Sequence, residues 1–318
     1  PAKDKQAGET PNKYGAEPLI WSEGMLAALE KGVKGNKWFS LIDKVYAERT
    51  LELAWEKVRI NAGACGIDGT TIGAFGKDSQ RRLLAVREHL KGGTYEPKPV
   101  KRVMIPKLGS VETRPLGIPT VRDRVVQTAL KMVVEPIFEK EFAPQSYGFR
   151  PGRGCKDALR RVDQLLKSGY HHVVDVDLKS YFDTISHKRL MELVAERIAD
   201  GRVLALIEQY LKQGIIEGDN EWEAGEEGSP QGAVISPLLA NLYLNSLDWL
   251  MANAGIEMVR YADDSVALCK SASEAKQALE KIRQWCEEME LILHPEKTRV
   301  VDMSAEKATL DFLGYTFY

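Results

Sequence analysis

The sequence predicts a mixed α+β fold in which a few strands are covered by several helices. Apolar residues recur at helical spacing in many segments, whereas short apolar runs with strand character are few and irregularly placed. Size is the third observation. With 318 residues, of which 44% are hydrophobic, the chain can bury a sizeable core and form two packed subdomains.

The elements are expected in the following order. Residues 1–22, which include PAKDKQAGETPNKYGAEP, are polar and predict a disordered leader. Helical periodicity predicts helices over 38–62, 77–90, 122–142, 156–167, from 187 onward, 202–213, 233–252 and 273–289. Strand character predicts a basic, proline-punctuated hairpin at 97–119, strands at 171–178 and on both sides of 261–264, and short strands at 298–303 and 311–318.

Charge is distributed unevenly, although the formal net charge is only −2. Residues 81–124 hold eleven Lys or Arg against four Asp or Glu, whereas residues 191–228 hold three against ten. This asymmetry predicts a basic face that favours polyanions and an acidic back. Composition alone is equally consistent with an ordinary solvated surface.

Cysteine usage and hydropathy indicate the compartment. Cys65, Cys155, Cys269 and Cys286 are far apart and form no CxxC pair, which predicts neither a disulfide framework nor a zinc site. No apolar run approaches the roughly 20 residues of a membrane span, and the N-terminal segment has no apolar signal core. We therefore expect a cytoplasmic protein without a membrane partner.

Adjacent carboxylates stand where a hairpin should turn. In IEMVRYADDSVALC (256–269), two apolar runs flank Tyr261, Ala262, Asp263 and Asp264. Like charges this close repel and raise one another's pKa unless something positive lies between them. A bound cation is the expected neutraliser, although an Asp-Asp pair taken alone is more often a solvated turn.

A second carboxylate cluster lies in VVDVDLKSYFD (173–183). Asp175 and Asp177 point to one face of the predicted strand, and Asp177 stands next to a loop, where Asp indicates a site rather than a core. Beside the 256–269 hairpin, Asp177, Asp263 and Asp264 would form an oxygen-ligand site suited to Mg²⁺ or Mn²⁺. Two such ions support in-line phosphoryl displacement. Asp-Val-Asp also suits a metal-dependent glycosyltransferase, which would leave YADD and SPQG unexplained.

Seven blocks in order resemble those of one enzyme family. YADD resembles the YxDD box of reverse transcriptases, and DVDLKSYFDTISH resembles their first catalytic motif. The blocks IPKLGSVETRPLGIPTVRDRVVQ, QSYGFRPGRGCKDAL, GSPQGAVISPLLANLYLN and HPEKT, together with GIDG at 66–69, resemble those of group II intron-encoded reverse transcriptases. The resemblance covers about residue 38 to the end.

The resemblance implies roles for individual residues. Asp177 and Asp263 would be the principal metal ligands, and Asp264 would complete the environment of a second Mg²⁺, with Mn²⁺ as the alternative ion. Asp175 departs from this role and is interpreted as a supporting residue. Lys107 and Arg114 match fingertip residues that hold the incoming triphosphate, since such side chains neutralise developing phosphate charge.

Further motif positions are assigned in the same way. Tyr181 matches the aromatic that blocks a 2′-hydroxyl, where Phe would be expected in this group. Gln231 matches a residue that contacts the nucleotide and template, and Gly232 would let the backbone approach closely. Lys297 matches a residue proposed to protonate the pyrophosphate leaving group.

The QSYGFRP block resembles a template-strand contact. Arg150 would bind phosphate, while Tyr147 and Phe149 are predicted to pack the fingers against the palm. PheLeuGlyTyrThrPhe at 312–317 resembles the primer-grip strand, after which a thumb would be expected.

The resemblance implies a right-hand polymerase fold with a ferredoxin-like antiparallel palm sheet. The expected divisions are an N-terminal extension and start of the fingers at 23–96, fingers at 97–170, and palm at 171–318 with an insert at about 187–228. A thumb and a maturase domain are not expected within this chain.

The implied reaction is RNA-templated DNA synthesis from a primer 3′-hydroxyl. Its partners would be an RNA template, a DNA or RNA primer, deoxynucleoside triphosphates and intron RNA; nothing in the sequence indicates a homodimer. Two alternatives stay open. One is a phage-defence or CRISPR-associated reverse transcriptase, and the other is a non-catalytic RNA-binding maturase, which would be expected to have lost one of the three carboxylates.

Overall fold

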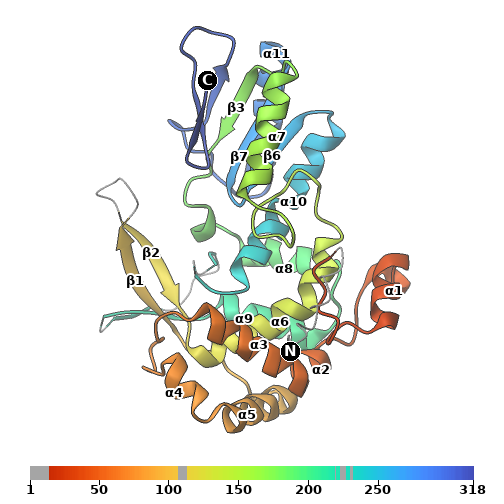
Figure 1. Ribbon diagram of the computed structural model, residues 1–318, viewed down its shortest axis with the longest axis vertical. Helices are drawn as coiled ribbons and strands as arrows, with labels where there is room; N and C mark the ends of the chain where they lie inside the picture. Colours follow the sequence, from red (N-terminus) through yellow and green to blue (C-terminus); the bar gives the residue numbers. More distant parts are fainter. Residues whose placement is uncertain (1–13, 107–112, 219, 223–226, 230–231) are drawn as a thin grey trace, which may run out of the picture.

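The chain forms an upper and a lower part, which lie one above the other in Figure 1. The computed structural model describes residues 14–106, 113–218, 220–222, 227–229 and 232–318. The upper part is built around one four-stranded sheet, here called the upper sheet, and the lower part contains a second one, the lower sheet.

The upper sheet has the order β6-β7-β3-β8, and all neighbouring strands are antiparallel. Its strands are β3 (His172–Val176), β6 (Glu257–Tyr261), β7 (Asp264–Cys269) and β8 (Arg299–Asp302). Helix α10 (Ser236–Asn253) precedes β6, and α11 (Ala272–Glu288) joins β7 to β8. This βαββαβ order with two central antiparallel strands is the ferredoxin-like sheet that the sequence predicts.

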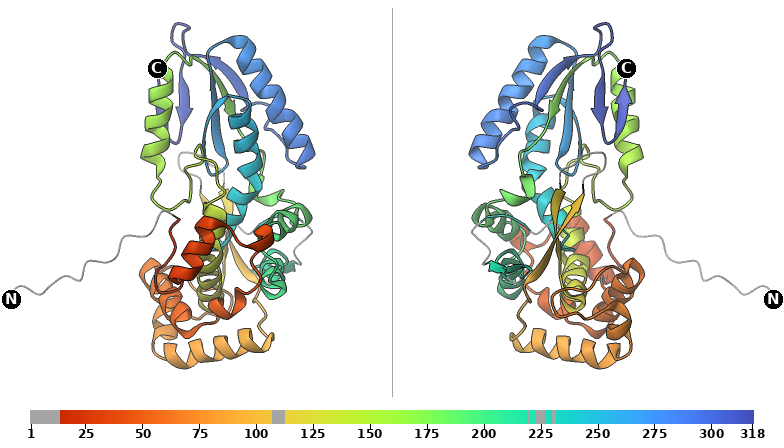
Figure 2. Two further views of the ribbon diagram at one scale, coloured as in Figure 1. Left: turned by 90° about the vertical axis from the view of Figure 1, so that its right-hand side faces the viewer. Right: turned by 90° about the vertical axis from the view of Figure 1, so that its left-hand side faces the viewer.

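Both faces of the upper sheet are covered, as Figure 2 shows. Val174 and Ala267 point toward α10 and α11, whereas Val173 and Val266 belong to a second cluster with α7 (Cys155–Lys167) and the hairpin of β9 (Leu310–Phe312) and β10 (Tyr315–Phe317). Because side chains alternate along a strand, Asp175 and Asp177 share the Val173 face. The strand carboxylates therefore face the β9–β10 side.

The lower sheet has the order β2-β1-β4-β5. Its strands are β1 (Val100–Pro106), β2 (Thr113–Ile118), β4 (Ile215–Glu217) and β5 (Asn220–Trp222). The lower part also contains α1 (Glu23–Lys31), α2 (Ile42–Val45), α3 (Glu48–Asn61), α4 (Ile72–Gly76), α5 (Ser79–Gly92), α6 (Val121–Glu139), α8 (His187–Ala195) and α9 (Gly201–Leu211), with short 3₁₀ turns η1 (Lys34–Asn36) and η2 (Tyr181–Asp183).

Two long helices, α6 and α10, are buried on nearly all sides and connect the two parts. Most residues of both are inaccessible to solvent. The composition of α10 predicts this, since a helix that is apolar all round belongs in an interior, whereas α6 also buries polar residues such as Asp123 and Gln127. Helix α6 begins where the Thr120 hydroxyl accepts a hydrogen bond from the Asp123 amide. Helix α10 begins at the Ser236-Pro237 step, and proline is favoured at a helix start.

The main differences from the sequence predictions lie near the ends of the chain. The disordered leader is wrong for residues 14–22, because Trp21 is buried and its indole N–H donates to the Met132 carbonyl at 3.2 Å; residues 1–13 lie outside the described part. The helix expected over 38–62 is divided into α2 and α3, and the strand at 311–318 is a hairpin with a turn at Leu313 and Gly314. The strands β4 and β5 were not predicted.

All four cysteines are free, in agreement with the sequence. Among the described residues, no helix combines the length and the apolar character that crossing a membrane requires.

Candidate active site

The end of β3 meets the β6–β7 hairpin. Strand β3 pairs with β7 in a register that ends at Val176 opposite Ser265, so one further step places Asp177 opposite Asp264. Tyr261 pairs with Asp264, which leaves Ala262 and Asp263 as the two turn residues. The three carboxylates predicted from two separate motifs are therefore brought to the same end of the upper sheet.

The HPEKT segment holds Asp177 in place. The Asp177 carbonyl accepts hydrogen bonds from the His294 amide at 2.8 Å and the Thr298 hydroxyl at 3.1 Å. One residue further, Leu178 forms an isolated antiparallel bridge with Leu293. This motif therefore fixes the backbone of Asp177, a contact that its sequence alone does not reveal.

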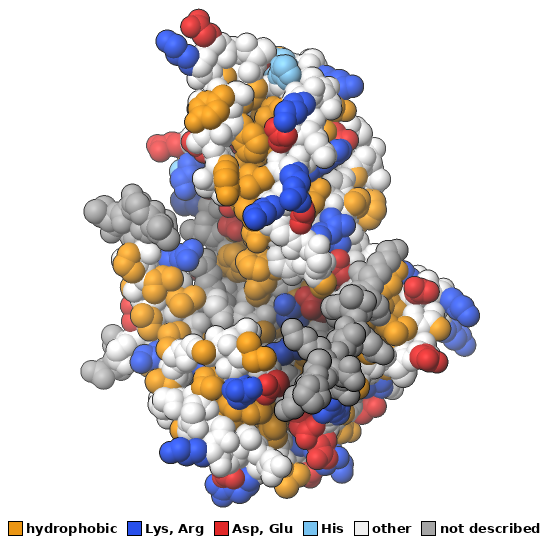
Figure 3. Space-filling model, in the orientation of Figure 1, with side chains coloured by type: hydrophobic (Ala, Val, Ile, Leu, Met, Phe, Trp, Pro, Cys, Tyr) orange, Lys and Arg blue, Asp and Glu red, His pale blue; other side chains and the backbone are white. Residues whose placement is uncertain are grey.

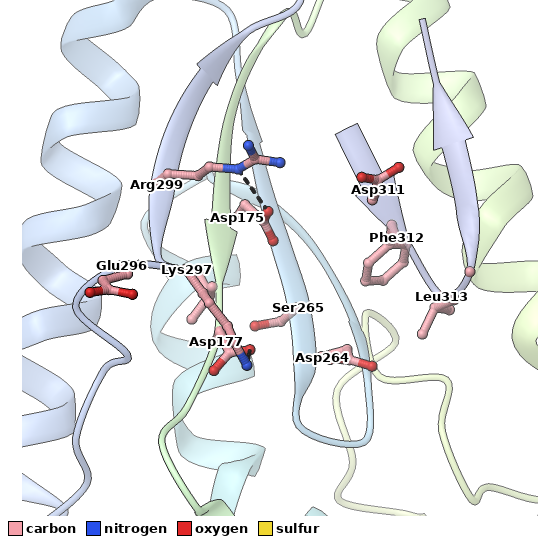
Figure 4. A pocket seen from close by; sticks show the side chains of 12 residues that line it. Asp175, Asp177, Asp264, Ser265, Glu296, Lys297, Arg299, Asp311, Phe312 and Leu313 are labelled. Carbon is pink, nitrogen blue, oxygen red and sulfur yellow. Dashed lines mark hydrogen bonds and ion pairs between the residues drawn. The ribbon is translucent and has the colours of Figure 1, made fainter. Parts of the chain in front are cut away.

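An open cleft of about 430 Å³ lies beside these carboxylates (Figure 4). Asp177 and Asp264 line it from the upper sheet, Lys297 from the loop before β8, and Phe312 from β9. The Lys297 ammonium lies 3.4 Å from an Asp177 carboxylate oxygen. Arg299 lies at the same distance from Asp175, so Asp175 has a cationic partner on the neighbouring strand.

The carboxylates disfavour one another's ionised form. Burial, followed by the charges of Asp263, Asp177 and Asp175, raises the pKa of Asp264 to about 6, although part of its side chain is exposed. Burial and the Asp177 charge also raise the pKa of Asp263, whereas Arg260 opposes this shift. The cluster thus carries unfavourable negative charge that a cation would relieve.

These residues fit a hard divalent ion in chemistry but are not gathered around a single point. The donors are carboxylate oxygens, and hard cations prefer oxygen ligands. Within the described residues, however, no three His, Cys, Asp or Glu side chains are close enough together to hold a metal ion. The oxygen ligands and the repulsion among the carboxylates therefore suit a divalent cation. The described side chains are not yet close enough together to surround one.

A buried arginine holds the turn of Ala262 and Asp263, here called the catalytic turn, at which the proposed catalytic carboxylates meet. The side chain of Arg260 is 1% exposed, and its five N–H groups are matched by five acceptors. Nε and Nη2 donate to the Asp248 carboxylate, Nη1 donates to Asn241 Oδ1 and to the Ala262 carbonyl at 2.8 Å, and Nη2 also donates to the Ser146 hydroxyl. One guanidinium therefore joins β6, α10, the turn and the 143–150 loop.

The 143–150 loop packs directly beneath the turn. The Tyr147 amide donates to the Arg260 carbonyl at 2.8 Å, so the loop continues the edge of the upper sheet beside β6. At Gly148, an added Cβ would lie 2.3 Å from the Ala262 nitrogen. Only a residue without a side chain allows this contact.

The prediction that Tyr181 lies under the nucleotide sugar is wrong. Its side chain is buried, 2% exposed, and its hydroxyl donates to the Ala240 carbonyl of α10 at 2.7 Å. The cause is local, because Ser180 adopts φ +50° and η2 follows, so strand alternation does not continue past Asp177. The neighbouring Phe182 is only partly buried.

The prediction that Arg150 binds phosphate is also wrong. The side chain is 4% exposed; Nε and Nη2 donate to Glu139, and Nη1 donates to the carbonyls of Ala143 and Ser146. Arg150 therefore fixes the loop that supports the catalytic turn.

This correction predicts how Arg150→Met should behave. Removing one partner of a buried ion pair leaves Glu139 charged and unpaired, so we expect a loss of about 3–5 kcal/mol of unfolding free energy. Denaturant unfolding measures this loss. The half-exposed Arg197, paired with Glu141 at 3.0 Å, provides a control in Arg197→Met, which should cost much less. Unchanged stability with a smaller salt dependence of RNA binding would instead support a phosphate contact.

The remaining predicted residues have mixed outcomes. Lys107 and Gln231 lie outside the described residues. Arg114 is exposed on β2, opposite Ile105. The backbone at Gly232 lies close to another part of the chain, as predicted, and that part is strand β2. A Cβ added to Gly232 would lie 2.4 Å from the Gly117 carbonyl oxygen.

The basic face expected over residues 81–124 is partly neutralised within the molecule, since five of its eleven Lys and Arg are in ion pairs within the described part of the chain. Carboxylates lie within 4 Å of many of its cations, in the pairs Arg81–Asp78, Arg87–Glu48, Lys98–Asp68, Arg102–Glu217 and Arg122–Asp123. Figure 3 shows acidic and basic side chains interspersed on the face that it displays. A local excess of Lys and Arg in the sequence therefore does not form a continuous basic surface there.

The carboxylate repulsion has a measurable consequence for stability. Because Asp264 has a folded-state pKa of about 6, above its ordinary 3.8, the folded state holds its proton more tightly than the unfolded state. The contribution of Asp264 to the free energy of unfolding should therefore fall as pH rises from about 4 to 6 and stay lower above that range, and the difference between the wild type and Asp264→Asn isolates this contribution.

Asp264→Asn removes this cost, so in EDTA at pH 7 its melting temperature should exceed that of the wild-type chain, and Mg²⁺ should stabilise it less. Asp302→Asn is the control: hydrogen bonds from Ser304 lower the pKa of Asp302, so this variant should gain nothing. Thermal scans with and without Mg²⁺ measure these differences. Equal melting temperatures of Asp264→Asn and the wild type in EDTA would contradict the assignment.

Sequence analysis missed Arg260, Asp248, Asn241 and Gly148. A signal was present for two of them, since Arg260 lies among apolar residues in the strand EMVRY, whose other charged residue, Glu257, is at its first position, and Asp248 is the one acidic residue in the apolar helix SPLLANLYLNSLDWLMAN. A charge inside an apolar element calls for a buried partner. Which partner each takes could not be read from the sequence.

Comparison with known proteins identifies the family. The family described as "Reverse transcriptase (RNA-dependent DNA polymerase)" matches residues 105–317. "Protein YkfC" of Escherichia coli (strain K12) is 36% identical over 277 residues, which cover 74% of this chain and 71% of that protein. "Group II intron-encoded protein LtrA" of Lactococcus lactis subsp. cremoris is 38% identical over 198 residues, which cover 62% of this chain but only 32% of that protein.

A solved structure agrees at the level of the fold. A telomerase from Candida albicans, in complex with a fragment of telomeric RNA, has a TM-score of 0.52 at 14% identity, covering 71% of this chain and 46% of that one. The chain has a right-hand polymerase fold of fingers and palm, with a ferredoxin-like antiparallel sheet. The chain belongs to the reverse transcriptase (RNA-dependent DNA polymerase) family and has group II intron-encoded proteins among its relatives.

Proposed function

We propose that the chain copies RNA into DNA at the cleft beside Asp177, Asp263 and Asp264. The observation that carries this proposal is the placement of Asp177 one register step beyond the β3–β7 ladder, opposite Asp264 and beside the 262–263 turn. Three carboxylates at the open end of a sheet, with a lysine in the same cleft, suit transfer of a nucleotidyl group to a primer 3′-hydroxyl.

Reverse transcriptases use divalent metal ions, and we propose two Mg²⁺ here, with Mn²⁺ as a substitute. Asp177 and Asp263 would be the principal ligands, and Asp264 would complete the second site. When bound, the ions would stabilise charge on the attacking and leaving oxygens. The chain's own contribution is to fix Asp177 through HPEKT and the turn through Arg260.

Nucleotide contacts are proposed from the fingers and from the cleft. The exposed Arg114 near the hairpin tip, together with Lys107, would hold the triphosphate. Lys297, already 3.4 Å from Asp177, would lie beside the departing pyrophosphate and protonate it. Gln231, next to Gly232, would contact the nucleotide and template.

We propose that Phe182, and not Tyr181, is the aromatic residue that selects deoxynucleotides by blocking a 2′-hydroxyl. Phe182 is partly exposed and its ring lies edge-on to Tyr181, with ring centroids 5.4 Å apart, so the buried tyrosine supports it. Its carbonyl accepts a hydrogen bond from the Ser229 amide, which places it beside the SPQG block. A rigid ring there would exclude a 2′-hydroxyl through a steric clash.

This assignment is tested by a pair of variants. Phe182→Val should increase incorporation of ribonucleotides at least several-fold, because it opens space for the hydroxyl. Tyr181→Phe should leave sugar selection unchanged and cost about 1 kcal/mol of stability, through the lost hydrogen bond to Ala240. Competition between a deoxynucleotide and the matching ribonucleotide, with thermal scans on the same samples, measures both effects. Relaxed selection in Tyr181→Phe alone would refute the reassignment.

The wider setting is proposed from the relatives. Residues 97–170 would be fingers and 171–318 palm with a fingers-like insert at about 187–228, preceded by an N-terminal extension and the start of the fingers at 23–96. The template would include intron RNA, a DNA or RNA primer would supply the 3′-hydroxyl, and the protein would act in the cytoplasm and assist splicing and mobility of its intron.

Primer extension on an RNA template tests the proposal. Each deoxynucleotide is supplied in turn, and only the one complementary to the template should be added, in Mg²⁺ but not in EDTA. The same primer on a DNA template shows whether RNA is preferred. Failure to extend a primer that the folded chain binds would reject the proposed activity.

A further inference from the structure

Phe149 exposes its ring although its two neighbours are buried. Its side chain is 49% exposed, and its backbone has φ +57°, a conformation that a bulky residue rarely adopts. Such strain persists only where the surroundings impose it, and it is concentrated at functional sites.

Gly148 and Arg150, the residues before and after Phe149, impose this conformation. Gly148 is wedged against Ala262, and its carbonyl accepts a hydrogen bond from the Asn241 side chain at 2.7 Å. Arg150 is buried in its bonds to Glu139 and to two loop carbonyls. With Gly148 and Arg150 both fixed, the backbone between them is held in place and directs the ring of Phe149 outward.

The exposed ring lies beside the catalytic turn. Its centroid is 6.2 Å from that of Tyr261, which precedes Ala262 and Asp263, and the two rings are tilted by 41°. Tyr147, two residues earlier, belongs instead to the cluster beneath α7. Packing of the fingers against the palm therefore accounts for Tyr147, as predicted, but not for the exposed Phe149.

We propose that Phe149 is a nucleic-acid contact, which stacks on a base or sugar of the strand bound at the catalytic turn. The proposal rests on the proposed function, since a strand whose end reacts beside Asp263 has to pass over the side chains around that turn. Aromatic faces bind bases without sequence preference, because every base presents a flat face. A side chain whose backbone is already fixed loses less conformational entropy when a base covers it than one on a mobile loop.

The test compares binding of a primer–RNA template duplex by fluorescence anisotropy. Phe149→Leu keeps an apolar side chain but removes the ring, and we expect roughly tenfold weaker binding. Phe149→Tyr should restore affinity. Since stacking involves no phosphate, the salt dependence of Phe149→Leu should equal that of the wild type.

A stability measurement excludes a merely structural role. Asn tolerates positive φ better than Phe, so Phe149→Asn should unfold at the same or a higher temperature while binding as weakly as Phe149→Leu. Wild-type affinity in both variants would overturn the proposal, as would loss of affinity that tracks loss of melting temperature. If the wild-type chain itself does not bind the duplex, the proposed function fails rather than the role of Phe149.

Discussion

Asp263→Asn should reduce primer extension by at least roughly a thousandfold while leaving RNA binding and folding intact. Asn has the shape of Asp but lacks the negative charge that a divalent ion requires. The turn itself should remain in place, because it is held by contacts to Ala262 and not by the Asp263 side chain: Arg260 donates to the Ala262 carbonyl, and Gly148 packs against its nitrogen. Single-turnover extension on an RNA template measures the effect.

The same experiment includes its controls. Melting temperature and duplex affinity should match those of the wild-type chain, since burial and the charge of Asp177 raise the pKa of Asp263 by more than a hydrogen bond from its own backbone and the charge of Arg260 lower it. Removing its charge should therefore not destabilise the fold. Extension within tenfold of the wild type would show that Asp263 is not a metal ligand.

Gly148→Ala should lower extension by about a hundredfold. The new Cβ would lie 2.3 Å from the Ala262 nitrogen and 2.9 Å from the Tyr261 carbonyl carbon, both backbone atoms that cannot rotate away. Either the turn or the 143–150 loop has to shift, and a displacement of about 1 Å at a catalytic group costs on the order of 10² in rate. Steady-state extension rates provide the measurement.

Gly201→Ala is the matched control for this substitution. Gly201 begins α9, has no positive φ, and has no atom within 4 Å of an added Cβ, so Ala should be neutral or slightly stabilising there. Comparable extension by Gly148→Ala and Gly201→Ala would mean that the loop does not support the turn.

The parts of the fold that follow from periodicity could be predicted from the sequence. Strand β3, the β6–β7 hairpin and the long helices α6, α10 and α11 have continuous patterns of apolar residues, and each lies within a few residues of its expected range. Strands β4 and β5 span only three residues each, so they carry no period to detect. Trp21 stands in a polar segment, and only the tertiary contact with Met132 reveals its burial.

In the candidate site too, residues with a local sequence signal could be predicted, and residues whose partners are distant in the sequence could not. The three carboxylates were singled out by local signals, an Asp-Asp pair at an expected hairpin turn and Asp177 at the end of an apolar strand, and their roles were implied by the family resemblance. Tyr181 was misassigned because the left-handed Ser180 rotates the chain after Asp177. Arg150 was expected to bind phosphate and Arg260 was given no role, since their partners Glu139 and Asp248 come from helices elsewhere in the sequence.

Single-nucleotide extension by Asp175→Asn and Asp177→Asn tests the central claim most directly. The two aspartates stand two positions apart, share one face of the upper sheet and line the same cleft, but Asp175 is paired with Arg299 whereas Asp177 lies opposite Asp264. We predict that Asp177→Asn abolishes extension on an RNA template and that Asp175→Asn retains most of it. Equal loss in both variants, or extension by Asp177→Asn, would contradict the assignment of the catalytic carboxylates.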